Sequence, residues 1–200
     1  EKEKHKKELS AFCRACSDPV YIQDYFLSDG HSEKTTNASA TFIKFGRNYY
    51  ACTCWHVVEG MVQKGAETDN DRITLGLMVG KAVINLSSFR VDGLRSAFTR
   101  PDGVLANDKI DIGLANIDSV WHLLERDKGK VAIDFDHREI PPWDEIEVGA
   151  AAGYPTEHKE RSGDVVETPM TLTIAELCST ISADVRQFTL SSTLDEPHGF

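Results

Sequence analysis

The stretch ATFIKFGRNYYACTC, residues 40–54, decides how the chain begins to fold. Residues 40–45 and 49–54 are both rich in residues that favour strands, and Gly46-Arg47-Asn48 separates the two runs. Two such runs around a short glycine-containing segment predict a β-hairpin. His56 follows directly, so we expect it to end the returning strand and to open a helical turn over residues 57–63.

Most of the remaining chain also predicts strands. Helical character is expected only over residues 1–16 and in the short turns at 57–63 and 120–125. Strands are predicted at residues 72–79, 81–86, 110–117, 130–135 and 145–152, and in two long runs rich in Thr, Val and Ile at 165–180 and 181–190. Many short strands without a regular alternation of strand and helix predict an all-β barrel or sandwich.

The composition excludes several classes of partner. The chain has 200 residues and a net charge of −10, which argues against a surface for duplex nucleic acid or for anionic lipid. No apolar run approaches the roughly 20 residues that span a bilayer. Five cysteines, an odd number without a dense framework, predict reduced thiols and therefore a cytoplasmic protein.

His56 and Asp111 are the residues that we expect to carry chemistry. Asp111 lies between Ile110 and Ile112 in a predicted strand, where burying a carboxylate is costly unless another group pairs with it. A histidine suits that role, because the carboxylate fixes the tautomer of the imidazole and stabilises its protonated form. The alternatives are that His56 only caps a turn and that Asp111 only accepts a hydrogen bond from a backbone N–H.

Three motifs in this order resemble those of the trypsin-like (chymotrypsin-fold) serine proteases. They are TCWHVV at 53–58, DIGL at 111–114 and GYP at 153–155. The resemblance implies two six-stranded antiparallel β-barrels, over residues 40–125 and 126–200, with the second barrel incomplete in this chain. A short N-terminal helical extension, residues 1–39, would precede them. Within this resemblance His56 is the general base and Asp111 is its orienting carboxylate.

The same resemblance implies roles for residues near Phe200. Gly199 matches the glycine whose backbone N–H forms part of the oxyanion hole, and Asp195 matches the base of the specificity pocket. His198 would contact the substrate beside the cleft. Alternatively, Asp195 is a solvated turn residue and His198 is an ordinary loop residue. The spacing in this family, roughly 93 positions from the aspartate to the serine, places the nucleophilic serine just after Phe200. No Gly-x-Ser-Gly or Gly-x-Cys-Gly motif occurs in these 200 residues.

We therefore expect a serine endopeptidase that hydrolyses protein or peptide substrates through an acyl-enzyme, without a cofactor or a metal ion. The alternative is a protease-like fold that serves as a non-catalytic binding or regulatory module. Residues 1–39 have no counterpart in the family and could dock a partner. No nucleic acid or membrane partner is expected.

The spacing Cys13-x-x-Cys16 raises one metal hypothesis. Cys52 and Cys54 could complete a zinc site with this pair only if the N-terminal helix packs beside their strand. Cys52 and Cys54 face the same side of a strand, and we expect that side to be the core. The sequence thus favours structural roles for these thiols.

Overall fold

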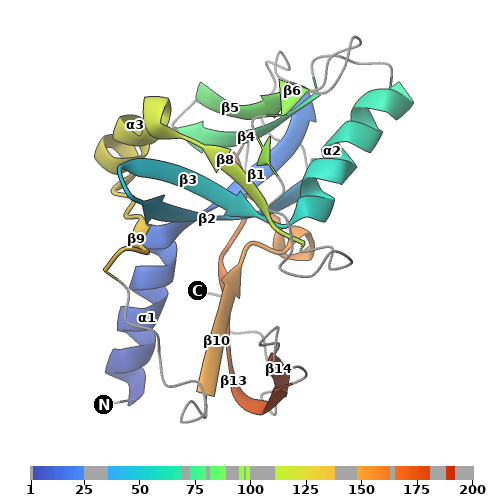
Figure 1. Cartoon of the computed structure of the whole chain (residues 1–200). Helices are drawn as coiled ribbons and strands as arrows, with labels where there is room; N and C mark the ends of the chain where they lie inside the picture. Colours follow the sequence, from blue (N-terminus) through green and yellow to red (C-terminus); the bar gives the residue numbers. More distant parts are fainter. Residues whose placement is uncertain are drawn as a thin grey trace.

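A nine-stranded sheet, antiparallel except at one pairing, curls like half of a barrel and dominates the fold (Figure 1). The computed structural model describes residues 2–24, 36–68, 73–79, 82–88, 95–96, 98–99, 111–137, 148–162, 165–180 and 188–191. The strands of this sheet are β1 Ser17–Asp24, β2 Thr36–Phe45, β3 Asn48–Thr53, β4 Ile73–Val79, β5 Ala82–Ser88, β6 Arg95–Ser96, β7 Phe98–Thr99, β8 Gly113–Asn116 and β9 Ile133–Asp134. They lie in the order β6-β5-β4-β1-β2-β3-β8-β7, and β9 pairs with β2 in parallel.

Three α-helices accompany the strands in the described part of the chain. They are α1 Lys2–Cys16, α2 Trp55–Thr68 and α3 Asp118–Lys128, and a short 3-10 helix, η2, covers Thr156–His158. The helix α2 buries Val58, Met61 and Gly65, and α3 buries Trp121 and Leu124. Both helices therefore contribute an apolar face to the same core as the sheet.

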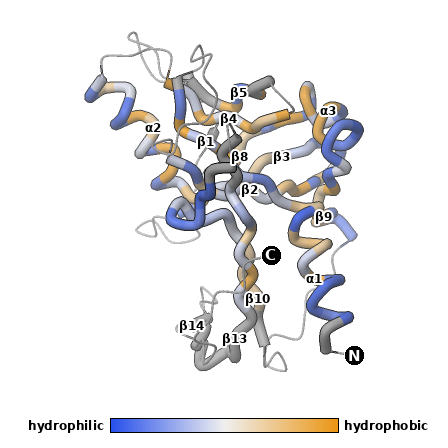
Figure 2. Tube along the Cα trace, turned by 180° about the vertical axis from the view of Figure 1, so that it is seen from behind, coloured by the Kyte–Doolittle hydropathy of each residue, from blue (hydrophilic) through white to orange (hydrophobic). Residues whose placement is uncertain are grey.

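The main core lies between the curled sheet and the helices α2 and α3. Phe42 and Ala51 are opposite one another in the β2–β3 hairpin, and both are fully buried. The ring of Trp121 stacks on Tyr49 and meets Phe42 edge to face, with ring centroids 4.6 and 5.7 Å apart. Figure 2 shows the hydrophobic stretches gathered in the sheet and in the two helices beside it, whereas much of α1 is hydrophilic.

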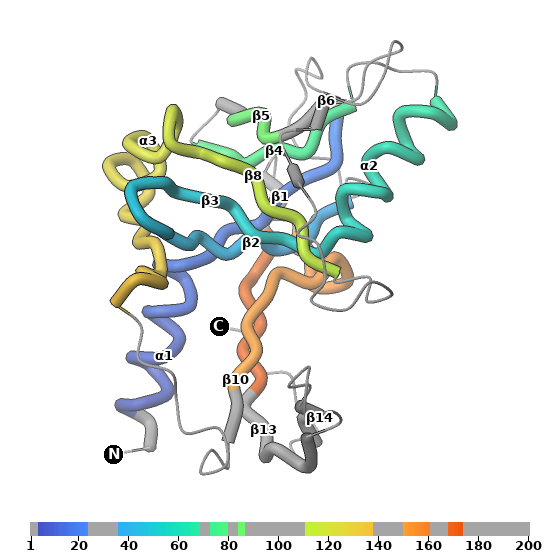
Figure 3. Tube along the Cα trace, viewed as in Figure 1, coloured from blue at the N-terminus to red at the C-terminus, as the bar shows by residue number. Residues whose placement is uncertain are grey.

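Two smaller sheets follow in the C-terminal part of the chain. One contains β10 Val148–Gly153, β13 Thr171–Thr180 and β14 Phe188–Ser191, and the other contains β11 Glu160–Ser162 and β12 Val165–Glu167. The β10–β13 pair is separate from the large sheet and extends away from it on the same side as α1 (Figure 3). A small second core forms there, where Tyr154, Met170 and Leu172 pack with Leu9 and Cys13 of α1.

The local sequence predictions agree with this fold where the pattern is strong. The hairpin over residues 40–54 is confirmed as β2 and β3, with Thr41 opposite Cys52 and Phe45 opposite Asn48. Its turn contains Gly46 at φ 61°, a left-handed conformation that suits glycine. The predicted helix at residues 1–16 and the hairpin of β4 with β5 are confirmed as well.

Several predicted bounds were wrong. The turns expected at 57–63 and 120–125 are the longer helices α2 and α3, which are stabilised by packing on the sheet. The strand expected over 110–117 begins only at Gly113, and the run 165–180 divides into β12 and β13. The strand expected over 130–135 is the shorter β9, Ile133–Asp134, which pairs with β2.

The N-terminal segment contributes directly to the large sheet. The strand β1, which lies within residues 1–39, pairs with β2 on one side and with β4 on the other. The strand β9, which lies within residues 126–200, also belongs to this sheet. The sheet thus includes strands from both sides of the boundaries expected at 39–40 and 125–126. The protein is mostly β, as predicted, and its described part contains a curled half-barrel sheet, two smaller sheets and a few helices; the arrangement in two six-stranded barrels stays a prediction.

Candidate functional site

His56 lies in the first turn of α2, immediately after the end of β3. The strand β3 ends at Thr53, Cys54 forms the link, and α2 begins at Trp55. The backbone N–H of Val57 donates to the carbonyl of Cys54 at 3.1 Å, which closes the first turn of the helix. The sheet therefore fixes the backbone of His56 while its side chain, 68% exposed, remains accessible.

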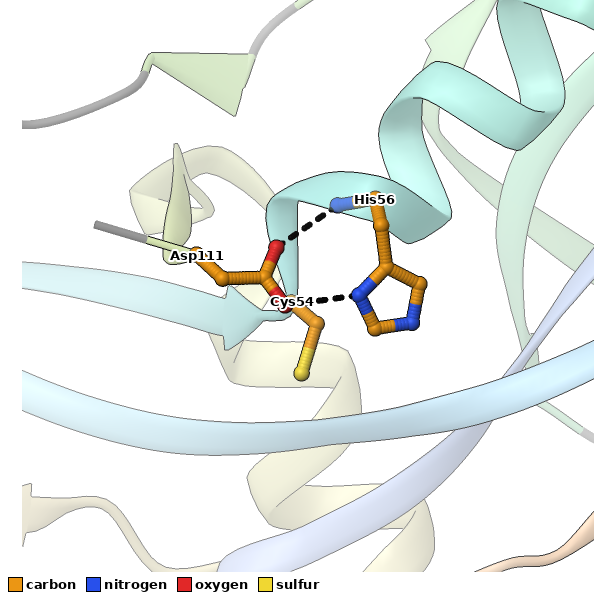
Figure 4. A group of neighbouring side chains, drawn as sticks. All are labelled: Cys54, His56 and Asp111. Carbon is orange, nitrogen blue, oxygen red and sulfur yellow. Dashed lines mark hydrogen bonds and ion pairs between the residues drawn. The ribbon is translucent and has the colours of Figure 1, made fainter. Parts of the chain in front are cut away.

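The side chains of His56 and Asp111 meet across 55 positions of the sequence. Ring Nδ1 of His56 lies 2.7 Å from Oδ2 of Asp111 (Figure 4). The backbone N–H of His56 donates to Oδ1 of the same carboxylate at 2.8 Å. The predicted contact between the imidazole and the carboxylate is thus confirmed, and a second, backbone contact accompanies it.

The surroundings of Asp111 differ from those predicted. Asp111 lies two residues before β8 rather than inside a strand, and its side chain is 51% exposed rather than buried. The pairing of β3 with β8 places Thr53 opposite Gly113, so the end of β3 and the residues before β8 are neighbours. This pairing brings Asp111 to the beginning of α2 without burying it.

The electrostatics of the carboxylate follow from this position. The backbone N–H of His56, followed by its imidazole, holds the pKa of Asp111 below its usual value. The amides at the beginning of a helix carry partial positive charge, which favours the ionised carboxylate. Asp111 is therefore an anion at neutral pH, and it can stabilise a protonated imidazole.

The orientation of the ring determines which nitrogen can act. Nδ1 faces Asp111, and the other ring nitrogen, Nε2, points away from the carboxylate (Figure 4). A carboxylate at Nδ1 favours the tautomer that carries its proton there, which leaves the lone pair on Nε2. The pair has the geometry of a general base and its orienting acid.

Cys54 is the third member of this group, and the sequence reasoning placed it in the core instead. The thiol sulfur, a ring nitrogen of His56 and a carboxylate oxygen of Asp111 all lie within 4.8 Å of one another. Partial desolvation raises the pKa of the Cys54 thiol, and the negative charge of Asp111 raises it further. The thiol is therefore protonated at neutral pH and is a poor nucleophile by itself.

The expected direction of Cys52 and Cys54 was wrong. Ala51 and Thr53 are the buried residues of β3, whereas Cys52 is partly buried and Cys54 is exposed. Alternation along the strand puts the two cysteines on the face away from the main core. The spacing Cys54-x-His56, with the thiol directly after β3 and the histidine in the first turn of α2, was the signal that could have revealed the group.

The remaining predicted site residues lie outside the described part of the chain. They are Asp195, His198 and Gly199. Among the described residues Cys13, Cys16, Cys52 and Cys54 are free thiols and do not form a four-cysteine group. The zinc site considered from the Cys13-x-x-Cys16 spacing therefore does not form from these four residues.

Comparison with known proteins does not assign this site. No protein-family model matches the chain, and neither a curated protein nor a solved structure matches it significantly. The helices in the described part of the chain are all too short or too polar to cross a bilayer. A function for this protein must therefore be inferred from the geometry of His56, Asp111 and Cys54.

Proposed function

We propose that the protein is a serine endopeptidase in which His56 is the general base and Asp111 orients it. The observation that carries this proposal is the contact of 2.7 Å between Nδ1 of His56 and Oδ2 of Asp111. The motif order of the sequence, with TCWHVV first, DIGL second and GYP third, adds to it.

In the proposed reaction, Nε2 of His56 accepts the proton of a serine hydroxyl while the serine oxygen attacks the carbonyl carbon of the substrate. The resulting imidazolium is stabilised by the carboxylate of Asp111, and it then donates the proton to the departing amine. Water, deprotonated by His56 in turn, hydrolyses the acyl-enzyme. No cofactor takes part in this sequence of steps.

The nucleophile and the rest of the cleft belong to the same proposal. We place the serine just after Phe200, Gly199 in the oxyanion hole, and Asp195 and His198 beside the substrate. We also propose a second, chymotrypsin-like barrel that includes β10 and β13. Support comes from the GYP motif at the end of β10, where the backbone N–H of Tyr154 donates to Oγ of Ser39 in β2 at 2.8 Å. The free thiols support a reducing, cytoplasmic environment.

Labelling with a fluorophosphonate probe tests this function. Because we place the nucleophile after Phe200, the experiment uses a protein that includes that continuation. We expect covalent labelling of one serine, and we expect His56→Ala to reduce the labelling rate by at least about 1,000-fold, since the base is lost. His122→Ala, which removes an exposed histidine on α3, is the matched control and should label like the original protein.

Two results would overturn the proposal. One is equal labelling of the His56→Ala variant and the original protein, because the imidazole would then have no part in activating a serine. The other is a folded protein that is neither labelled by the probe nor able to cleave peptides. The second result would favour the alternative, a protease-like fold that binds without turnover.

A further inference from the structure

Three side chains of metal-binding type converge at the beginning of α2. Cys54 comes from the link between β3 and α2, His56 from the first turn of the helix, and Asp111 from the residues before β8 (Figure 4). One sulfur, one nitrogen and one oxygen, each a possible ligand atom, lie within 4.8 Å of one another. In the part of the chain that the structure describes, no other three His, Cys, Asp or Glu residues come together in this way.

The spacing of these atoms is close to that of a tetrahedral zinc site. With bonds of about 2.0–2.3 Å, the ligand atoms of such a site are about 3.3–3.8 Å apart. The distance of 2.7 Å between His56 Nδ1 and Asp111 Oδ2 would have to widen by about half an ångström, and the sulfur would have to approach by at most about 1.5 Å. All three residues are exposed, so rotation of their side chains can make these changes without repacking the core.

The chemistry of the donors selects the metal. A thiolate and an imidazole suit zinc, whereas magnesium and calcium prefer oxygen ligands alone. Three protein ligands leave the fourth position of the tetrahedron open for water or an incoming group, as in catalytic zinc sites. The hydrogen bond of 2.8 Å from the backbone N–H of His56 to Oδ1 of Asp111 can remain and orient the ligating carboxylate.

We propose that Cys54, His56 and Asp111 bind one Zn²⁺ ion through a thiolate, a ring nitrogen and a carboxylate oxygen, with water as the fourth ligand. On binding, the thiol of Cys54 releases its proton to solvent, and no oxidation or reduction takes place. The ion occupies the space between the imidazole and the carboxylate. It therefore separates His56 from the group that orients it.

One consequence depends on the proposed function, although the binding itself does not. If His56 is the base of a serine endopeptidase, zinc at this place removes the Asp111 contact from the ring, so zinc inhibits the enzyme. Cys54, as the third ligand, then makes the activity of the His56–Asp111 pair sensitive to zinc. A hydrolase with the same His–Asp pair and no adjacent thiol would lack this third ligand.

A cobalt titration of the 200-residue chain tests the binding without any need for catalysis. Co²⁺ replaces Zn²⁺ as a coloured probe, and a thiolate ligand produces a charge-transfer band in the near ultraviolet. We expect one equivalent of Co²⁺ to produce this band and added Zn²⁺ to abolish it. Cys54→Ser should lack the band, and His56→Ala and Asp111→Asn should each bind at least about 100-fold more weakly.

Two variants that each remove a different thiol serve as controls for Cys54→Ser. Cys52→Ser, two residues earlier in β3, and Cys13→Ser, in α1, should keep both the band and the affinity. Circular dichroism verifies that each variant is folded. The proposal fails if folded Cys54→Ser keeps the band, if His56→Ala and Asp111→Asn both bind like the original protein, or if the original protein binds neither metal. None of these outcomes alters the labelling test, so the two proposals fail independently.

Discussion

At the scale of single residues, Asp111 combines two contacts through its two oxygens. Oδ1 accepts from the backbone N–H of His56 at the beginning of α2, and Oδ2 contacts the imidazole. The first contact satisfies a helix amide that has no partner within the helix, and the second orients a side chain. Alanine at this position removes both contacts at once. Asparagine keeps an acceptor for the helix and removes the negative charge, so it separates the two roles.

A second carboxylate, Asp134, predicts how stability changes with pH. Its side chain accepts from Nζ of Lys44 at 2.8 Å and lies 3.1 Å from Nδ1 of His137. The hydrogen bond from Lys44, followed by that from His137, holds the pKa of Asp134 well below its usual value. The ionised carboxylate is therefore favoured in the folded protein compared with the unfolded chain.

We expect the stabilisation from Asp134 to be complete above the unfolded pKa of about 3.9 and to be lost as the pH falls towards the lower folded value. Asp134→Asn should thus be less stable than the original protein at pH 7, and the difference should shrink below about pH 4. Urea unfolding at a series of pH values measures this difference in the free energy of unfolding. Glu157→Gln, which removes an exposed carboxylate outside this cluster, is the control. A difference between Asp134→Asn and the original protein that stays constant down to about pH 2 would contradict the assignment.

At the scale of elements, two glycines adopt a left-handed backbone conformation. One ends a helix, and the other lies in the turn of a hairpin. The helix α3 ends at Gly129, with φ 62°, where the N–H of Gly129 donates to the carbonyl of Glu125 and that of Lys130 to the carbonyl of Leu124. Gly46, with φ 61°, turns β2 into β3. No neighbouring atom would meet an added Cβ within 4 Å at either glycine, so only backbone conformation opposes a side chain there.

We expect Gly129→Ala and Gly46→Ala each to lower the free energy of unfolding by about 1–2 kcal/mol, the cost of a left-handed backbone for a residue with a Cβ. Gly60→Ala in α2 is the control. Its Cβ would make an ordinary contact of 3.8 Å with Cδ1 of Ile22, and alanine favours a helix. That variant should match the original protein or be more stable by up to about 1 kcal/mol. Equal effects at the three positions, measured by thermal or urea unfolding, would exclude the conformational explanation.

At the scale of the whole molecule, Lys130 joins the N-terminal segment to the region after α3. Its buried Nζ donates to the carbonyls of Arg14 at 2.8 Å and Ser17 at 2.6 Å, and it lies 3.0 Å from Oδ1 of Asp18. Lys128 also pairs with Asp18. Burial lowers the pKa of Lys130, and the charge of Asp18 opposes this shift. The group holds the junction of α1 and β1 beside the end of α3.

We expect Lys130→Met to lower the free energy of unfolding by about 3–5 kcal/mol, because it leaves two carbonyls and a buried carboxylate with fewer partners. The comparison is Lys4→Met, which removes an exposed lysine paired with Glu8 at 3.8 Å on α1. That change should stay within about 0.5 kcal/mol. Similar urea unfolding curves for the two variants would show that the buried contacts of Lys130 contribute little to stability.

The sequence predicted the elements better than their lengths and partners. The β2–β3 hairpin has a glycine turn between two strand-forming runs, so both strands could be recognised from neighbours in the chain. The full length of α2 could not be recognised in this way. The helix is stabilised by burial of Val58, Met61 and Gly65, which depends on residues distant in sequence. The contact of His56 with Asp111 could be predicted from motif order, but the exposure of both side chains could not.

By itself, the sequence determined the mostly β character of the chain, the helix at its N-terminal end and the hairpin that leads to His56, because each depends on residues close together in the chain. Only the tertiary structure decided that β1 lies between β2 and β4, and that Cys54 joins His56 and Asp111 at one place. Strand order and side-chain convergence depend on pairings between distant segments, and the free energy of those pairings comes from the folded sheet as a whole.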